Sequence, residues 1–241
     1  MNSEACRDFC GIDADTYSAL YERFLKRSPS ELLDLVPMKA GDDVLDLCAG
    51  TTFRLTREAL ARGAGHVDVV DLACDIYAVS DQSGALHGTL IYSCGVTKFL
   101  DARYDIKRFR RYDVVACQQG INYWWNDTSK SAGMVSAMLK PGGTFVFNTF
   151  NTCPSRKPVV KEYELVNSEG KLERLVEVYY RSGDQVHHIQ TREGYPPHAT
   201  TFDWITPHKF RKDLKSHFKS VDKHTDSGTD IYVCRKGNDD A

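Results

Sequence analysis

The sequence predicts an α/β protein with a doubly wound, mostly parallel, seven-stranded Rossmann-like sheet, an N-terminal helical cap and an antiparallel meander inserted after the fifth strand. Short apolar strands alternate with helical segments from residue 42 to 150, and this alternation is typical of right-handed crossovers and a parallel sheet. From residue 159 the segments alternate with a period of two, which indicates antiparallel strands. We therefore expect a single domain over 1–241, with the cap at 1–40, the core at 41–150, the insertion at 159–205 and a closing helix and hairpin at 206–236.

The expected elements follow from local signals in chain order. Apolar residues at helical spacing predict a helix over 13–27, and a capping box at Ser28 with proline at the next position predicts a short second helix that ends at Pro37. In the core we expect strands at 43–47, 67–71, 89–93, 112–117 and 143–149, helices at 52–62, 74–85 and 128–139, and a connection between 94 and 111.

The last third of the chain is expected to be mostly antiparallel. Turn residues at 167–170 and 182–184 separate three alternating segments, 161–166, 172–180 and 185–192. Thr206 and Pro207 are typical of a helix start, and Phe210, Leu214 and Phe218 would share one face of that helix. Segments 219–221 and 230–234 are expected to pair as a closing hairpin.

A turn of small residues follows the first core strand. Cys48, Ala49 and Gly50 come directly after the acid-bearing strand 43–47. Small residues let the backbone approach a ligand closely, and glycine readily takes a positive φ. Thr51 and Thr52 lie at the N-terminus of the next predicted helix, where free backbone N–H groups attract a phosphate or a carboxylate.

A second acid, Asp71, ends the next strand 21 residues after Gly50. A carboxylate at this place suits both hydroxyls of a ribose and repels a 2′-phosphate. The turn keeps one of the three glycines of a dinucleotide fingerprint, and the chain has no phosphate-binding Gly-Lys-Ser/Thr loop. The ligand is therefore expected to be a nucleoside without a pyrophosphate, which disfavours NAD-dependent oxidoreduction and nucleoside triphosphate hydrolysis.

Residues 44–51 resemble the first motif of class I S-adenosylmethionine-dependent methyltransferases, in which an acid precedes a glycine-rich turn. The resemblance continues in the family's order through Asp71, strand 112–117 and the Pro-Gly-Gly turn within 139–147, so it covers about residues 40–150. Cys48 and Thr52 stand where the family commonly has glycines. At Val96 the chain lacks the acid that meets the adenine in many relatives, and a backbone carbonyl or Thr97 is the expected substitute.

The resemblance implies S-adenosylmethionine as the cofactor and a methyl transfer to a nitrogen or an oxygen of a small-molecule acceptor by in-line displacement. The cofactor contacts are expected at Tyr21, Asp46, Cys48, Ala49, Gly50, Thr51, Asp71, Leu72, Ile76, Gly95, Val96, Gln118 and Gln119. For Tyr21, packing within the cap is the alternative role. A noncatalytic cofactor-binding or regulatory protein is the alternative function.

In this family the loop after the fourth strand lies beside the reacting methyl group. An amine acceptor only has to arrive neutral, whereas a hydroxyl acceptor benefits from a general base, most often histidine. Packing or surface roles remain the alternatives for the histidines, aromatic residues and amides concerned. We expect catalytic roles for His188, Asn122 and Tyr123, and substrate contacts from Trp124, Asn148 and His187.

The composition limits the kinds of partner that we expect the protein to bind. The net charge of −2 and the pI near 6.4 indicate no general nucleic-acid surface. Eight cysteines without a Cys-x-x-Cys pair or a Cys/His cluster predict no metal and a reducing, cytoplasmic location. With no signal peptide and no segment of membrane-spanning length, we expect no membrane partner, a small-molecule substrate, and a monomer or homodimer.

Overall fold

The structure is a computed structural model, and it describes two compact units. One unit comprises the described residues of 28–150 and 206–238, and the other those from Cys153 to Ile205. Each unit is considered by itself. The described residues are 28–50, 53–71, 90–93, 96–106, 111–118, 120–125, 127–150, 153–166, 170–193, 197–226 and 229–238.

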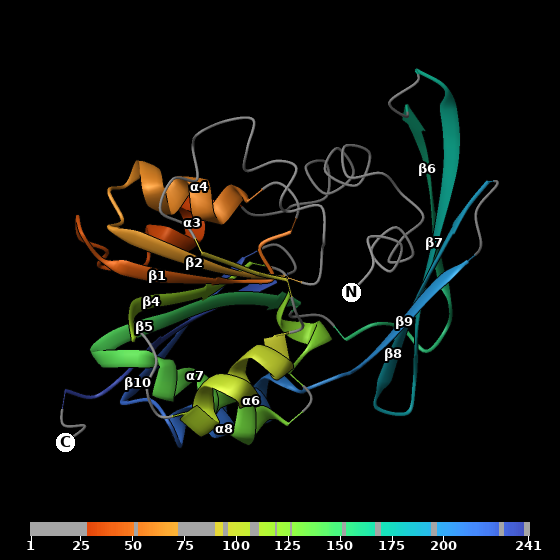
Figure 1. Ribbon diagram of the computed structural model, residues 1–241. Helices are drawn as coiled ribbons and strands as arrows, with labels where there is room; N and C mark the ends of the chain where they lie inside the picture. Colours follow the sequence, from red (N-terminus) through yellow and green to blue (C-terminus); the bar gives the residue numbers. More distant parts are fainter. Residues whose placement is uncertain are drawn as a thin grey trace. The chain divides into compact units, whose positions relative to one another are not determined.

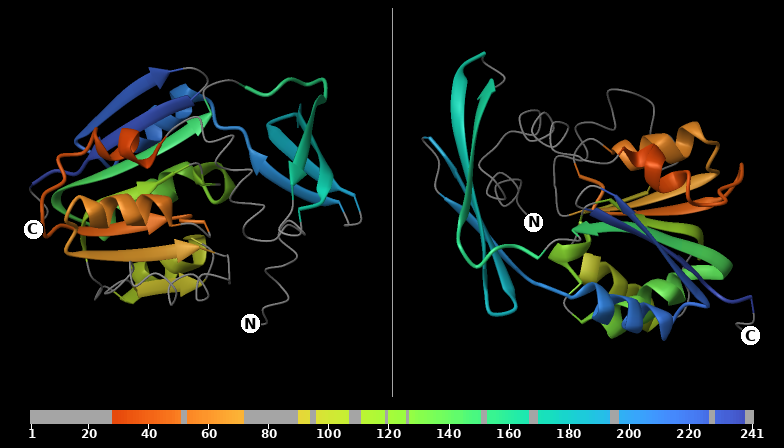
Figure 2. Two further views of the ribbon diagram at one scale, coloured as in Figure 1. Left: turned by 90° about the horizontal axis from the view of Figure 1, so that it is seen from above. Right: turned by 180° about the vertical axis from the view of Figure 1, so that it is seen from behind.

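The larger unit is built on a seven-stranded sheet with the order β3-β2-β1-β4-β5-β11-β10 (Figures 1 and 2). The first five strands of the chain pair in parallel, whereas β11 pairs antiparallel with both β5 and β10. The strand order therefore reverses between β1 and β4, which is where doubly wound sheets bind ligands. The strands are β1 (Asp43–Leu47), β2 (His66–Asp71), β3 (Leu90–Ser93), β4 (Tyr112–Cys117), β5 (Leu139–Phe150), β10 (Ser220–Asp226) and β11 (Thr229–Arg235).

Helices cover both faces of this sheet (Figure 1). On one face lie α3 (Pro29–Leu33) and α4 (Arg54–Ala61), and on the other α6 (Val96–Ile106), α7 (Thr128–Met138) and α8 (Pro207–Lys215), as the rear view in Figure 2 also shows. The central strands are apolar on both faces because helices bury both. Val44, Leu45 and Leu47 of β1 are fully buried.

An aromatic cluster fills the core beneath α7 and α8. The indole ring of Trp125 stacks on Phe145 and Phe147 of β5 and on Phe210 of α8, with ring centroids 5.5 to 6.0 Å apart. Burial of such large rings contributes strongly to stability. The predicted apolar face of α8 is confirmed for Phe210 and Leu214, which are buried, whereas Phe218, also buried, lies beyond the end of the helix at Lys215.

The predicted helix starts are confirmed at three places. Ser28 Oγ accepts a hydrogen bond from the backbone N–H of Glu31, and Pro29 occupies the first turn of α3. The Thr206 hydroxyl caps α8 in the same way, at 3.3 Å from the Lys209 nitrogen. The Asp127 carboxylate caps α7 through the Lys130 N–H at 3.1 Å.

Two core predictions are wrong in detail. The expected connection between 94 and 111 contains helix α6, whose buried Val96, Phe99 and Leu100 recur at helical spacing. The Pro-Gly-Gly turn does not precede the fifth strand, because β5 already begins at Leu139. A register shift against β4 between Tyr112 and Val114 accommodates this segment, and Gly142 within it has a φ of 75°.

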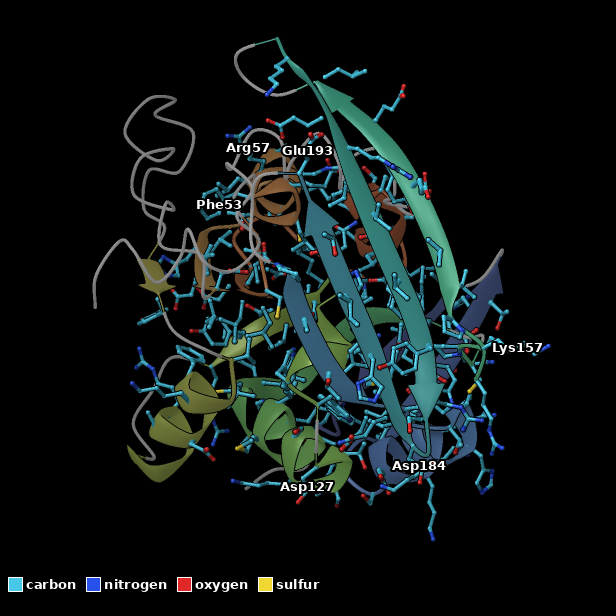
Figure 3. All side chains as sticks on the ribbon, turned by 90° about the vertical axis from the view of Figure 1, so that its right-hand side faces the viewer. Phe53, Arg57, Asp127, Lys157, Asp184 and Glu193 are labelled. Carbon is cyan, nitrogen blue, oxygen red and sulfur yellow. The ribbon has the colours of Figure 1, made fainter. Side chains whose placement is uncertain are left out.

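The smaller unit is an antiparallel sheet with the order β6-β7-β8-β9, which faces the viewer in Figure 3. The mostly parallel sheet with a separate antiparallel sheet confirms the predicted α/β class. A fourth strand, β9, follows the three alternating segments that the sequence indicated within the insertion. Asp184 marks the β7–β8 turn at one end of this sheet and Glu193 the other end (Figure 3). The strands are β6 (Val159–Val166), β7 (Leu172–Ser182), β8 (Gln185–Arg192) and β9 (His198–Asp203).

Two predicted helices, over 13–27 and 74–85, lie outside the described residues. Among the residues that are described, no helix is both long enough and apolar enough to cross a membrane.

Candidate functional site

The turn after β1 lies at the carboxyl edge of the larger sheet, beside the point where the strand order reverses. Cys48 continues the pairing of β1, since its N–H donates to the Val70 carbonyl at 2.8 Å. Gly50 has a φ of 66°, a conformation that favours glycine. In the described part of the chain, a Cβ added at Gly50 would meet no atom within 4 Å. The backbone of this turn is thus open to a ligand.

Asp71 is aimed at this turn. Its Oδ2 accepts a hydrogen bond from the Gly50 N–H at 2.9 Å, and the residue is half-buried at the end of β2. A carboxylate at the end of a strand beside such a turn is the kind of group that binds ribose hydroxyls in nucleoside sites. Asp71 and the small-residue turn are therefore in hydrogen-bond contact.

Asp46 lies fully buried beneath the turn. Its Oδ2 accepts from the Thr56 hydroxyl of α4 at 2.7 Å. Its Oδ1 has no hydrogen-bond partner in the described structure. Burial raises the pKa of Asp46 to about 7; the Thr56 hydrogen bond opposes this rise and the nearby charge of Asp71 adds to it.

Cys48 has a backbone conformation that is typical of glycine, and its side chain lies against a glycine, Gly120. Its φ is 61°, which a residue with a Cβ rarely adopts. Its side chain packs against Gly120 after β4, where an added Cβ would come within 2.2 Å of the Cys48 Cβ. The hydrogen bond with Cys117, together with burial, raises the pKa of the Cys48 thiol. The thiol is thus a neutral packing group under the turn.

Helix α4 begins without a capping side chain. Phe53 precedes it with a φ of 51° and is fully buried, and the first turn holds no acid. Arg54 occupies the first helical position, and its Nη1 is buried without a hydrogen-bond partner in the described structure. Phe53 and the exposed Arg57 mark this helix in Figure 3. Sequence reasoning missed Arg54, although a cation at a helix N-terminus is an unusual placement.

The loop after β4 brings further expected residues to the same edge of the sheet. Gln118 is half-buried there. Asn122, in the short 3₁₀ helix η1 (Ile121–Tyr123), accepts a hydrogen bond through Oδ1 from the Thr149 hydroxyl of β5 at 2.9 Å. Asn148 is buried on β5, one residue beyond the pairing of Phe147 with Cys117. Their expected roles in catalysis and substrate binding stay predictions.

Trp124 is buried and makes an edge-to-face contact with Trp125, with ring centroids 4.9 Å apart. This environment is that of a core residue, so its substrate contact stays a prediction. Val96 is buried at the start of α6, and Ala49 packs partly buried against the core.

The expected histidines belong to the smaller unit. His188 is buried on β8, where its Nε2 lies 3.2 Å from Glu177 Oε1 and its ring stacks on Tyr179 at a centroid distance of 4.1 Å. His187 stacks on Tyr180 at 4.8 Å. Burial opposes the charge of Glu177, but hydrogen bonds from His188 and Gln190 outweigh it and lower its pKa. A catalytic role for His188 and a substrate role for His187 stay predictions.

The remaining expected residues cannot be placed. The side chain of Tyr123 lies outside the described part of the structure, and so do six whole residues: Tyr21, Thr51, Leu72, Ile76, Gly95 and Gln119. The described residues hold no group of three or more histidine, cysteine or acidic side chains suited to a metal ion.

No protein-family model matches the chain, and no curated protein matches it in sequence. Solved structures match its fold over most of its length. An amino pentose methyltransferase from Micromonospora echinaspora, involved in calicheamicin biosynthesis and solved with S-adenosylmethionine bound, has a TM-score of 0.64 at 16% identity, over 91% of this chain and 96% of its own.

Two further structures show the same likeness. An S-adenosylmethionine-dependent methyltransferase from Clostridium acetobutylicum gives a TM-score of 0.65 at 16% identity, over 92% of this chain and 98% of its own. A sugar N-methyltransferase from a Streptoalloteichus species gives 0.56 at 16% identity, over 94% and 89%. At this identity the comparisons establish the fold, which is that of these methyltransferases.

Proposed function

We propose that the protein is a class I S-adenosylmethionine-dependent methyltransferase that acts on a nitrogen or an oxygen of a small molecule. The observation that carries the proposal is the hydrogen bond from the Gly50 N–H to Asp71 Oδ2. It joins the open turn after β1 to the acid at the end of β2, two features that suit a ribose-bearing ligand.

The residues around this turn fit such a cofactor. The space over Gly50 admits a ligand close to the backbone, and the half-buried Asp71 places a carboxylate, the group that suits ribose hydroxyls, beside it. The unpaired oxygen of Asp46 is a buried acceptor below the same turn. The likeness to solved methyltransferases, one of them with S-adenosylmethionine bound, supports this assignment.

The cofactor would supply an intrinsically reactive methyl group on a sulfonium. Transfer breaks the sulfur–methyl bond and forms a bond from the acceptor nitrogen or oxygen to carbon. The chain's contribution is to hold donor and acceptor in line and to exclude water. An amine would lose its proton after transfer, whereas a hydroxyl acceptor would require a base, for which His188 is the proposed residue.

Calorimetry with S-adenosylmethionine, S-adenosylhomocysteine and NAD tests the binding step. We expect binding of the first two and none of NAD. Incubation of the protein with methyl-labelled S-adenosylmethionine and a panel of amino sugars, amines and hydroxylated small molecules then tests the transfer. Absence of binding at millimolar cofactor refutes the proposal, and binding without transfer across the panel favours the noncatalytic alternative.

A further inference from the structure

Two cysteine thiols lie together beneath the turn after β1. Cys48 follows β1, and Cys117 ends the neighbouring strand β4, where it pairs with Leu47. Both cysteines are free, and their thiols share a hydrogen bond. A Cβ added at Gly120 would lie 2.5 Å from the Cys48 sulfur and 3.5 Å from the Cys117 sulfur. The two sulfurs therefore border the same small space.

The backbone places these two residues at a separation that suits a disulfide. Paired strands lie about 4.8 Å apart, and Cys48 is one residue beyond the pair that joins Leu47 to Cys117. A disulfide spans Cα separations of roughly 4.4 to 6.8 Å. In a regular strand the side chain after Leu47 would point away from Cys117. The alternation ends at Cys48, whose φ is 61°, and its thiol meets that of Cys117 instead.

The two thiols differ in how a small reagent reaches them. Cys48 is half-buried in the turn, whereas Cys117 is fully buried. A small oxidant that enters from the open side of the turn thus meets Cys48 first, and Cys117 is placed to react second. The hydrogen bond with Cys117, together with burial, raises the pKa of the Cys48 thiol. Its oxidation is therefore slow at neutral pH and accelerates as the pH rises, because the thiolate is the reactive form.

The turn that carries Cys48 is held between the strands on its two sides. Toward β2, the Cys48 N–H donates to the Val70 carbonyl at 2.8 Å, and the Gly50 N–H donates to Asp71 Oδ2 at 2.9 Å. Toward β4, the Cys48 thiol meets that of Cys117. A contact between two thiols is much longer than the sulfur–sulfur bond of about 2 Å. A disulfide would thus draw the turn toward β4 and away from its hydrogen bonds with β2.

We propose that hydrogen peroxide converts Cys48 and Cys117 to a reversible disulfide and that this bond weakens cofactor binding at the turn. The Cys48 thiolate attacks one peroxide oxygen, the oxygen–oxygen bond breaks, and a sulfenic acid and one water form. Cys117 then attacks the Cys48 sulfur and expels a second water. The two thiols lose two electrons and two protons to the peroxide. The disulfide itself stands on the contact between the thiols, whereas its effect on the cofactor rests on the proposed function.

Peptide mapping by mass spectrometry tests the bond. After incubation with hydrogen peroxide and alkylation of the remaining thiols, digestion without reductant should release one linked pair of peptides that carry Cys48 and Cys117. The pair should be absent from Cys48→Gly, in which glycine suits the left-handed backbone, and from Cys117→Ala. Cys153→Ser removes an exposed cysteine of the smaller unit and, as the matched control, should still yield the pair. Absence of the linked pair from the folded, unaltered protein overturns the proposal.

Calorimetry with S-adenosylhomocysteine tests the effect on the turn. Once the peroxide has been removed, the oxidised protein should bind this ligand at least about fivefold more weakly than the reduced protein. Dithiothreitol should restore the affinity, because it reduces a disulfide but not a methionine sulfoxide. Peroxide treatment should leave the affinity of folded Cys48→Gly unchanged, with folding judged by the melting temperature.

The outcomes separate this inference from the proposed function. A linked pair with unchanged affinity for S-adenosylhomocysteine would overturn the effect on the turn while the proposed function stands. Weakening that persists in Cys48→Gly, or that dithiothreitol does not reverse, would assign the effect to another residue and overturn it as well. A reduced protein that does not bind S-adenosylhomocysteine would overturn the proposed function, and the peptide map would still decide whether the disulfide forms.

Discussion

At the amino ends of its strands the seven-stranded sheet pairs its charges with one another, whereas at the carboxyl ends it leaves buried polar atoms unpaired. Asp68 of β2 accepts from the Tyr112 hydroxyl at 2.5 Å and lies 2.6 Å from His66 Nε2. Lys140 donates to both Asp43 and Asp113 at 2.9 and 2.7 Å. No side chain of these two groups is among the unsatisfied buried atoms found in the described structure.

The carboxyl ends present the contrary picture within the same unit. Asp46 Oδ1 and Arg54 Nη1 lack partners in the described chain, and Cys48 and Phe53 hold positive φ angles. Such costs persist in native proteins where surrounding structure enforces them, and they concentrate at functional sites. The comparison teaches that one edge of the sheet has its polar groups paired, whereas the opposite edge, where we propose that the cofactor binds, carries unsatisfied groups and unfavourable backbone conformations.

The pKa shifts of Lys140 and Asp46 follow the same difference between the two edges of the sheet. At Lys140, burial opposes the charge, but the bonds to Asp113 and Asp43 outweigh it and raise the pKa, so the ionised form is favoured. At Asp46, burial dominates and raises the pKa to about 7, so the ionised form is disfavoured. Asp43 and Asp113 at the amino edge share the cation Lys140, whereas Asp46 Oδ1 at the carboxyl edge has no hydrogen-bond partner in the described structure.

The largest expected effect concerns Asp46. Its folded pKa of about 7 lies above the ordinary value of 3.8, so the folded state binds the proton more tightly and stability falls as pH rises from about 4 to 7. Over this window the loss amounts to roughly 4 kcal/mol. Asp46→Asn keeps an acceptor for Thr56 and removes the titration. Denaturant unfolding at pH 4.5 and 7.5, without ligand, should show the stability of the variant rising relative to that of the unaltered protein by about 3 kcal/mol between the two pH values. Parallel pH profiles would contradict the assignment.

The next effect tests the amino edge. Asp68→Ala removes the partner of both Tyr112 and His66 and leaves the buried Tyr112 hydroxyl unpaired. Unfolding in urea should show a loss of about 3 kcal/mol, with an unchanged affinity for S-adenosylhomocysteine. Asp222→Ala serves as the control, because this exposed acid forms a long ion pair with Arg235 at 3.9 Å and its loss should cost less than about 1 kcal/mol. A large loss of ligand affinity in Asp68→Ala would contradict the conclusion that the amino edge contributes to stability and not to binding.

A smaller effect, on binding, tests the carboxyl edge. Asp71→Ala removes the proposed ribose contacts and should weaken S-adenosylhomocysteine binding about thirtyfold, which corresponds to about 2 kcal/mol. Stability should change little because the side chain is half-buried at a strand end. Asp71→Asn keeps an acceptor for the Gly50 N–H and should weaken binding less. Calorimetry that finds equal affinities in all three proteins would remove Asp71 from the site.

The division between the edges also explains what the sequence could predict. Hydrophobic periodicity indicated most of the strands and helices, because burial on one or both faces sets the spacing of apolar residues. It missed α6, where Val96, Phe99 and Leu100 are the buried positions that support the helix, and it placed the start of β5 too late. In the site, the acid and turn pattern correctly brought Asp71 and Gly50 together.

The unpaired atoms could not be predicted in the same way. Whether Asp46 Oδ1 or Arg54 Nη1 finds a partner depends on how β1, α4 and the surrounding segments meet in space, and no local pattern records that. The closeness of Cys48 and Gly120 is likewise a contact between residues 72 positions apart. Residues that act within one strand or turn could be predicted from the sequence, whereas the unpaired atoms and the contacts between distant segments could not.

The smallest expected effect tests the packing under the turn. Gly120 is buried with an ordinary φ of −93°, so alanine there is conformationally acceptable, but its Cβ would lie 2.2 Å from the Cys48 Cβ and 2.5 Å from its sulfur. Gly120→Ala should therefore destabilise the protein by about 2 kcal/mol. In a Cys48→Gly background the clash is absent, so the same substitution should cost at least about 1 kcal/mol less.

A double-mutant cycle measured by urea unfolding isolates this coupling from the separate costs of each change. Additive effects would mean that the strain comes from elsewhere in the loop. Coupling of the expected sign would show that the left-handed residue at Cys48 is held in place by the glycine opposite it. The turn after β1 would then keep its open backbone through a contact with the loop after β4, and the two loops that face the proposed cofactor would form one packed unit.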